Sequence, residues 1–423
     1  MLESLRKVWK IDDLRKKLIY TFLMLLLYRL VGVIPAPGVD AAKVLSSVGS
    51  DLPLLQLVNM MTGNAFAQMT IMAMGITPYI NASIIMQLLT IAIPALERMQ
   101  RDENGGKEKI QRISRYMTVA LAAIQAIGLV AGLGYIKAGW GNYILVGVSM
   151  AGGTALAMWI GERITDKGIG NGISLLIFAG IISNLFNGII ALITNAITTG
   201  TASAWIAVLS IIVVALVMTV VVTFVDLGER RIPLQIAKQV KGRRVYGGQN
   251  THMTLKVIAV GVMPLIFAYS FLSFPGTIGQ LVAPNSGFTS WCNEHLVNGA
   301  WFHLILSAVL IFAFTFFYSS ISFDAKKQAE QLQQQGATIP GRRGKDIASF
   351  LQRTTNRLNL FAACFLAVLA AIPTLMLSGL SLQVPFAASS MLIAVSVSLE
   401  TMRTIKGEMA IRGIESDKDN GFM

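Results

Sequence analysis

Charged residues are scarce in this sequence. They make up 13% of its 423 residues, against about 25% in soluble globular domains. Apolar residues reach 54%, and the mean hydropathy is +0.62. A chain with so little charge and so much apolar surface is typical of an integral membrane protein, and the composition excludes an ordinary soluble domain.

The few charges are almost absent from the long apolar runs. Ten runs of about 17–24 residues are each long enough to cross roughly 30 Å of hydrocarbon. They predict transmembrane helices at 18–34, 71–93, 116–136, 144–161, 173–194, 203–225, 257–274, 301–323, 358–377 and 386–404. Ionisable residues within them, such as Arg29, His303 and Glu400, lie toward the span ends. Proton pumps and ion-coupled transporters usually place such residues at the midplane, so the sequence disfavours both.

Catalytic and metal-binding motifs are also missing. The sequence has no HExxH, no nucleophile elbow and no phosphate loop. The segment GIGNG at 168–172 matches part of a dinucleotide fingerprint, but it precedes a membrane helix and follows no strand. Cys292 in an external loop and Cys364 in a helix lie at different membrane depths, which argues against a disulfide, and no spacing of Cys and His suggests a metal site. We therefore expect no enzymatic activity, no cofactor and no metal.

The basic residues are concentrated in alternating segments. Of the 35 Lys and Arg residues, 32 fall in 1–17, 95–115, 162–172, 227–256, 324–357 and 403–423. The positive-inside rule then predicts an even number of spans with both termini in the cytoplasm. The run 18–34 is longer than the apolar core of a signal peptide and has no plain cleavage site, so we expect an uncleaved first helix. We therefore attribute the net charge of +13 first to membrane topology. Binding of acidic partners is a second role that these basic residues could have.

Two kinds of loop depart from short connections. Segment 53–70 is apolar but too short and too polar in places to span, so it must lie in the interface or fold back into protein-lined space. Loops 227–256 and 324–357 carry the arginine pairs Arg243–Arg244 and Arg342–Arg343 beside glycines. Composition alone favours solvated basic connections for these loops, and docking surfaces are the alternative.

Isoleucines recur at every fourth position in two segments, at 76, 80 and 84 and again at 173 and 177. This spacing places each set on one face of a helix. Gly75 and Pro78 mark the start of the first helix, where proline costs little. Branched side chains in an uncharged interior suit a pore closed by dewetting, while a lipid-facing helix is the plainer alternative.

Several segments carry a resemblance to a known family. They are IPAPGVD (34–40), GITPYINASIIMQLL (75–89), WIGERITDKGIGNGISLLIFAG (159–180), GRRVYGGQNTHMTLK (242–256) and GVMPLIFA (261–268). In this order, and over nearly the whole chain, the sequence resembles the SecY family of bacterial protein-translocation channels. The resemblance implies an all-α membrane protein with ten transmembrane helices in two pseudo-symmetric five-helix halves, about 1–200 and 201–423, around an hourglass pore. The sequence alone hints at such inverted repeats only weakly.

The resemblance also implies roles for individual positions. The family's pore ring corresponds to Ile76, Ile80, Ile173, Ile177, Ile266 and Ile393. Segment 53–70 corresponds to the plug, with apolar residues Leu54, Leu57, Met60 and Met61 in need of cover. Ile84 and Gln87 lie on the second helix, which would face the seventh across a lateral gate. The docking loops for motor or ribosome correspond to 227–256 and 324–357, with Arg243, Arg244, Arg342 and Arg343.

The function implied by the resemblance is a passive, gated conduit in the bacterial cell membrane. Unfolded secretory polypeptides would cross through it, and hydrophobic segments would leave sideways into lipid. The implied partners are the small membrane subunits SecE and SecG, the SecA ATPase, the ribosome, signal sequences, nascent polypeptides and membrane lipids. The alternatives are an inverted-repeat secondary transporter, which would couple solute flux to an ion gradient, and a structural scaffold, which would not conduct when its plug is deleted.

Two segments depart from the family pattern. The segment FAASS at 386–390 has Ala387 and Ala388 where a glycine pair is usual, which we expect to shift Ile393. Gly344 follows Arg343 where a proline is typical, so the tip of that loop should be less rigid.

Overall fold

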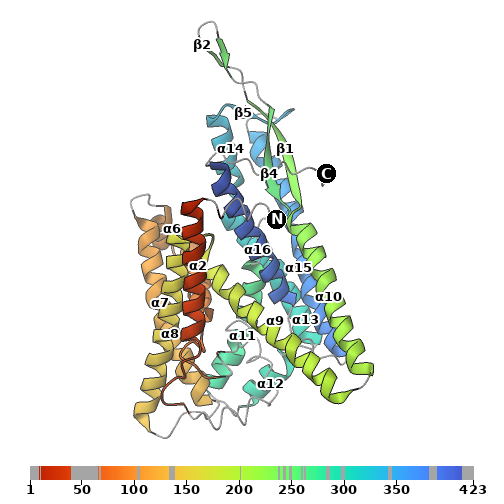
Figure 1. Ribbon diagram of the computed structural model, residues 1–423. Coiled ribbons are helices and arrows are strands. Elements are labelled where there is room, and N and C mark those ends of the chain that lie inside the picture. Colours follow the sequence, from red (N-terminus) through yellow and green to blue (C-terminus); the bar gives the residue numbers. More distant parts are fainter. Residues whose placement is uncertain are drawn as a thin grey trace. The chain divides into compact units, whose positions relative to one another are not determined.

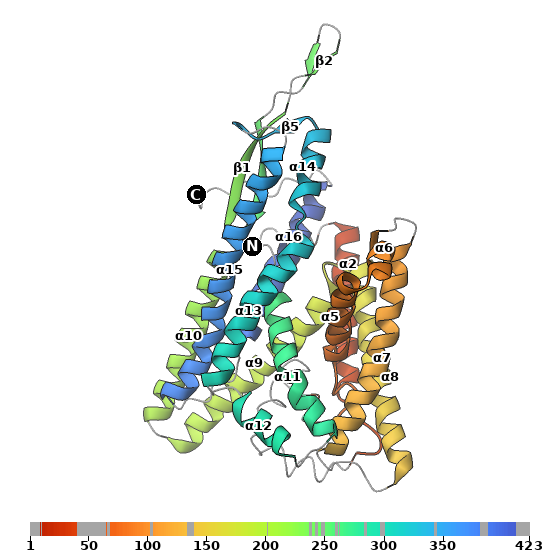
Figure 2. The ribbon, with the colours of Figure 1, turned by 180° about the vertical axis from the view of Figure 1, so that it is seen from behind.

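The computed structural model (Figures 1 and 2) describes residues 9, 11–39, 65, 68–101, 105–132, 139–200, 202–236, 239–241, 244–246, 250–258, 261, 263–282, 286–296, 301–341, 345–380 and 388–411. The chain falls into two compact units. Unit 1 comprises Met1–Val208, Leu272–Ala300 and Val397–Met423, and unit 2 comprises Leu209–Phe271 and Trp301–Ser396. The halves expected at about 1–200 and 201–423 rest on an inverted repeat and stay a prediction.

Unit 1 is built from helices. They are α2 (Asp12–Val31), α5 (Thr77–Ala92), α6 (Pro94–Arg101), α7 (Gly106–Gly132), α8 (Trp140–Lys167), α9 (Gly172–Thr199) and the short α12 (Gly287–His295). Helix α7 packs against both α5 and α8 (Figure 2), and α8 also packs against α2 and α9 (Figure 1). One buried cluster joins the segment before α5 to α7 and α8 through Met69, Met74, Ala126, Val146 and Met150.

The second predicted span, 71–93, begins later than expected and ends in a sharp bend. Residues 71–76 form turns, and α5 starts at Thr77 with Pro78 in its first turn. Helix α6 departs from α5 at an angle of 106°. Ile93 between them is extended because a residue before proline is disfavoured in the helical region, and Pro94 follows it.

Unit 2 combines long helices with a small β-sheet. Its elements, some shared with unit 1 across the boundaries, are α10 (Ala202–Asp226), β1 (Glu229–Ile236), β2 (Gln239–Lys241), β3 (Arg244–Tyr246), β4 (Asn250–Lys256), α11 (Met263–Val282), α13 (Trp301–Ser322), α14 (Ala325–Gln334), β5 (Ala337–Thr338), α15 (Lys345–Leu380) and α16 (Ala388–Ile411). Helices α13 and α15 lie side by side (Figure 2). Met218, Leu265, Ile311 and Leu366 belong to one buried cluster that joins α10, α11, α13 and α15.

The sheet corrects the expectation of a purely helical chain. Strands β4, β1 and β5 pair antiparallel in that order, and β2 pairs with β3 in a separate ribbon. In β1, buried Ile232 and Leu234 alternate with exposed neighbours, which is the period of two of a half-covered strand. The buried side chains pack with Ala329 and Leu332 of α14 and Leu351 of α15.

The predicted spans coincide with helices of the structure, but the ends of several helices differ from the predicted boundaries. Each of the ten ranges overlaps a helix, but α11 begins at Met263 rather than 257 because β4 continues to Lys256. Within the described residues, five helices are long and apolar enough to cross a membrane, or six if α5 and α6 count as one broken span. The remaining crossings stay predictions.

Candidate functional site

The isoleucines of α5 lie at its start and form one buried row. Ile76 is the N-cap residue, and its carbonyl accepts the backbone amides of Tyr79 and Ile80 at 2.9 and 3.1 Å. Ile76, Ile80 and Ile84 are all buried. The spacing of four therefore gives a continuous apolar stripe on this helix, as the sequence predicted.

Helix α9 carries the second isoleucine pair and has a well-defined start. The side chain of Asn171 accepts the amides of Ile173 and Ser174 at 3.1 and 3.3 Å, which satisfies two amides of the first turn. A Cβ atom on Gly172 would lie 2.0 Å from the carbonyl oxygen of Gly161 in α8. Only glycine permits the backbones of α8 and α9 to approach so closely. This close approach places the start of α9, which carries Ile173 and Ile177, beside α8.

The other two ring candidates belong to unit 2. Ile266 is half-buried in α11, and Ile393 is buried in α16. Aromatic rings attach α11 to α13. Phe267 meets Phe314 and Tyr318 edge to face at 6.0 and 5.8 Å, Phe271 meets Phe314 at 6.0 Å, and Tyr269 stacks on His303 at 6.3 Å. These contacts anchor the helix that carries Ile266 within its own unit.

The two gate candidates on α5 differ in polarity. Ile84 is buried, and Gln87, one turn later, is half-buried. Among the described residues, no hydrogen-bond partner reaches the buried Oε1 atom of Gln87. Within this mostly apolar helix, the unpaired oxygen of Gln87 is an acceptor that a polar group could reach.

Most plug and docking candidates lie outside the described residues. This holds for Leu54, Leu57, Met60 and Met61 of the plug and for Arg243, Arg342 and Arg343 of the docking loops. Arg244 lies in β3, opposite Lys241 of β2.

The end of the plug segment is tied to residues that follow α2. The Ala36 amide donates to the Met69 carbonyl at 2.9 Å, and the Ile71 amide donates to the Ile34 carbonyl at 3.0 Å. Thr70 forms an isolated bridge with Pro35. The segment 34–40 therefore anchors the chain where it enters α5.

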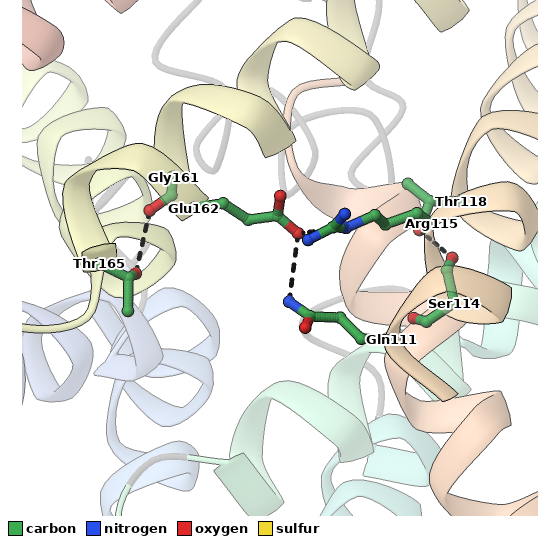
Figure 3. Close-up of polar contacts among 7 residues, drawn as sticks. All are labelled: Gln111, Ser114, Arg115, Thr118, Gly161, Glu162 and Thr165. Carbon is green, nitrogen blue, oxygen red and sulfur yellow. Dashed lines mark hydrogen bonds and ion pairs between the residues drawn. The ribbon is translucent and has the colours of Figure 1, made fainter. Parts of the chain in front are cut away.

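Sequence reasoning missed the polar contacts between helices. Arg115 of α7 points at Glu162 of α8, and its Nε lies 2.7 Å from the carboxylate, while Gln111 donates to the same oxygen at 3.4 Å (Figure 3). Lys17 of α2 pairs with Glu408 of α16 at 2.6 Å. No local pattern connects partners 47 or 391 positions apart.

The sheet and α14 form a compact platform with exposed positive charge. We define the basic platform as β1, β4, β5 and α14. Asp324 caps α14 by accepting the amides of Lys326 and Lys327 at 3.0 and 3.3 Å. The side chains of Lys326, Lys327, Arg230, Arg231 and Lys256 are exposed. A rigid core under a basic surface suits an acidic partner.

The cysteines remain thiols. Cys292 is buried in α12, and its burial raises the pKa of the thiol, whereas Cys364 is exposed on α15. In the part of the chain that the structure describes, no group of His, Cys, Asp and Glu side chains is arranged to hold a metal ion.

Several helices long and apolar enough to cross a membrane, with many large hydrophobic side chains exposed, define the class of multi-pass helical membrane proteins. A family model described as SecY matches residues 70–402. The protein translocase subunit SecY of Streptomyces galbus is 39% identical over 98% of this chain and 99% of that protein. The subunit of Corynebacterium glutamicum is 37% identical, over 96% and 98%. The chain belongs to the SecY family.

Solved structures share its fold. One, described as the structure of a protein conducting channel, gives a TM-score of 0.71 at 20% identity and covers 93% of this chain and 92% of that chain. Canine Sec61 in a ribosome–channel complex gives 0.67 at 18% identity, over 93% and 92%. At these identities the likeness carries the fold alone.

Proposed function

We propose that this chain is the protein-conducting subunit of a bacterial Sec translocase. Unfolded secretory polypeptides pass through it, and hydrophobic segments leave through a lateral gate into lipid. The observation that carries the proposal is the match over nearly the full length to translocase subunits at 36–39% identity. Movement is driven by an external motor or the ribosome, and the chain itself is not an enzyme.

The proposed seal is a ring of six isoleucines. Ile76 and Ile80 of α5, Ile173 and Ile177 of α9, Ile266 of α11 and Ile393 of α16 would meet at the neck of the pore. Branched apolar side chains make a narrow neck unfavourable for water and ions without binding the polypeptide. The buried row on α5 and the capped, glycine-packed start of α9 support this role.

The proposed gate and plug act beside the ring. Ile84 and Gln87 line the exit into lipid, and the unpaired Gln87 oxygen offers an acceptor to a polar group of a passing segment. The plug, 53–70, closes the external side through Leu54, Leu57, Met60 and Met61.

The proposed partners dock on the cytoplasmic loops. Arg243, Arg244, Arg342 and Arg343 belong to the same two loops as the basic platform, and they would contact the SecA ATPase or the ribosome. SecE and SecG are the expected small membrane subunits, and signal sequences, nascent polypeptides and membrane lipids complete the set. The chain crosses the bacterial plasma membrane several times with both termini in the cytoplasm.

A secondary transporter is not favoured. The apolar spans lack the midplane acids that ion coupling requires. A scaffold without a conduit stays distinguishable, because it would not conduct after deletion of the plug.

The direct test is crosslinking of an arrested secretory chain. Cys292 and Cys364 are replaced by Ala, and single cysteines are placed at Ile80, at Ile177 and at Leu216, which is exposed on α10. We expect the arrested chain to crosslink at Ile80 and Ile177 but not at Leu216. Equal crosslinking at all three positions, or none at the first two, contradicts the conduit.

A further inference from the structure

Arg29 is a cation within α2, the first of the predicted membrane spans, and the proposed pore does not use it. Placing a guanidinium in hydrocarbon is costly, so such a group faces protein and carries a role. In α2 the Arg29 side chain is half-buried, and its Nη2 donates a hydrogen bond to the backbone carbonyl of Ala179 in α9. A carbonyl has two lone pairs, so it can accept this bond in addition to the bond of its own helix.

Thr21 makes a second contact from the same helix. Its buried hydroxyl donates to the Lys17 carbonyl at 2.9 Å and accepts the amide of Ile169 at 3.1 Å. Ile169 lies in the glycine-rich turn between α8 and α9. A Cβ atom on Gly168 would lie 2.5 Å from this hydroxyl oxygen. The glycine therefore lets Thr21 reach the turn, which gives a structural reason for part of the GIGNG motif.

Along the sequence, the two contacts lie on either side of the ring candidates of α9. Ile169 precedes Ile173 and Ile177, and Ala179 follows them. Thr21 contacts Ile169, and Arg29, further along α2, contacts Ala179, which comes after Ile169. Helix α2 and the segment from Ile169 to Ala179 therefore run in the same direction. With 3.6 residues per turn, Ala179 lies roughly 140° around the helix from the midpoint of the two isoleucines. Helix α2 thus reaches α9 from the side away from them.

Helix α2 is itself firmly held. Leu14 is fully buried with Ile169 of the turn and with Ile405 and Met409 of α16. The Lys17–Glu408 ion pair joins the same two helices. All these residues belong to unit 1. Helix α2 is therefore anchored through its N-terminal half, which is also where Thr21 contacts the turn before α9.

We propose that α2 acts as a brace for α9, with Thr21 and Arg29 as positioning residues that hold Ile173 and Ile177 toward the conduit. The inference rests on the proposed function, because the ring role of the isoleucines is itself a proposal. Neither Thr21 nor Arg29 contacts the translocating chain in this scheme. Loosening the brace should make the ring leak although every isoleucine is still present.

The first experiment measures the contact itself by amide hydrogen exchange of the membrane-reconstituted chain. Thr21→Val keeps the side-chain shape but removes the acceptor of the Ile169 amide, and we expect that amide to exchange about fivefold faster. Thr21→Ser retains a hydroxyl and should behave as the parent does. The control is Thr118→Val, because buried Thr118 donates to Ser114 of its own helix at 2.7 Å.

The second experiment measures ion leak through the reconstituted channel in planar bilayers. The variants are Thr21→Val, Arg29→Met, their combination, and Ile177→Ser as a direct lesion of the ring. We expect each single variant to leak more than the parent and the combination to approach Ile177→Ser. Thr118→Val should be as tight as the parent. If Arg29→Met does not insert, Arg29→Lys, which retains a shorter cation, takes its place and should leak less than Thr21→Val.

The outcomes separate the brace from the pore. If Ile177→Ser leaks while the brace variants stay tight, the brace is overturned and the ring stands. If Ile177→Ser is itself tight, the ring role fails, and the positioning role of α2 falls with it even where Ile169 exchanges faster. Unchanged exchange at Ile169 in Thr21→Val overturns the contact that the inference requires.

Discussion

At the scale of single residues, two neighbouring glycines of α8 have opposite surroundings. A Cβ atom on Gly153 would lie 1.9 Å from the carbonyl oxygen of Ile71, whereas one on Gly152 would meet nothing within 4 Å. We expect Gly153→Ala to destabilise the protein by about 1–3 kcal/mol, because backbone must move. Gly152→Ala should be neutral or stabilising by up to about 1 kcal/mol. Thermal unfolding of both variants in one detergent decides, and equal midpoints would contradict the close approach of Ile71.

The ring isoleucines provide the functional prediction at this scale. Ile80→Ser and Ile177→Ser put a polar group into the proposed neck, and water is more stable beside it. We expect a higher resting ion conductance in planar bilayers with unchanged expression and insertion. Ile85→Ser is the matched control, because Ile85 lies on α5 but outside the row formed by Ile76, Ile80 and Ile84. A ring variant as tight as its parent would remove that residue from the seal.

The sequence pattern by itself predicted the placement of single side chains only where the chain repeats locally. The spacing of Ile76, Ile80 and Ile84 correctly predicted one shared face, because helix geometry alone fixes it. The partner of Arg29 was not predictable, since a backbone carbonyl 150 positions away leaves no mark in the side-chain pattern.

At the scale of elements, the sequence predicted helix positions better than breaks and strands. Pro94 directly follows the second apolar run and disfavours the helical backbone conformation at Ile93. A hydropathy average does not register this effect, so it did not predict the bend before α6. The strand β1 was missed because loop 227–256 was judged by charge. Its buried Ile232 and Leu234 alternate with exposed residues, a period that was available in the sequence.

The plug gives the prediction that belongs to this scale. Segment 53–70 ends where Met69 and Thr70 are tied to Ala36 and Pro35, so we expect its end to stay fixed while its apolar part moves. Cysteines placed at Leu57 or Met61 should resist external thiol reagents at rest and react once a secretory chain is engaged. A cysteine at Gln68, which is exposed, is the control and should react in both states. Equal labelling of Leu57 in the two states would favour a static interfacial helix.

At the scale of the whole molecule, one charge distribution serves two proposed purposes. We expect the basic segments to set the orientation of the helices, and the basic platform lies within two of these segments. Orientation depends on the summed charge of many residues, so no single arginine decides it. Docking depends on a few positions that a partner contacts. A single charge reversal therefore separates the two purposes.

We expect Arg343→Glu to impair motor-driven export into membrane vesicles severalfold, while insertion and orientation stay unchanged. Lys109→Glu is the matched control, because Lys109 is exposed on α7 and its reversal alters the charge of the predicted cytoplasmic side equally without touching the docking loops. If ribosomal RNA phosphates are contacted as well, ribosome affinity of the parent should fall steeply with salt, and Arg243→Glu should reduce that slope. Normal export by Arg343→Glu at matched expression would leave loop 324–357 a solvated connection and would restrict docking to loop 227–256.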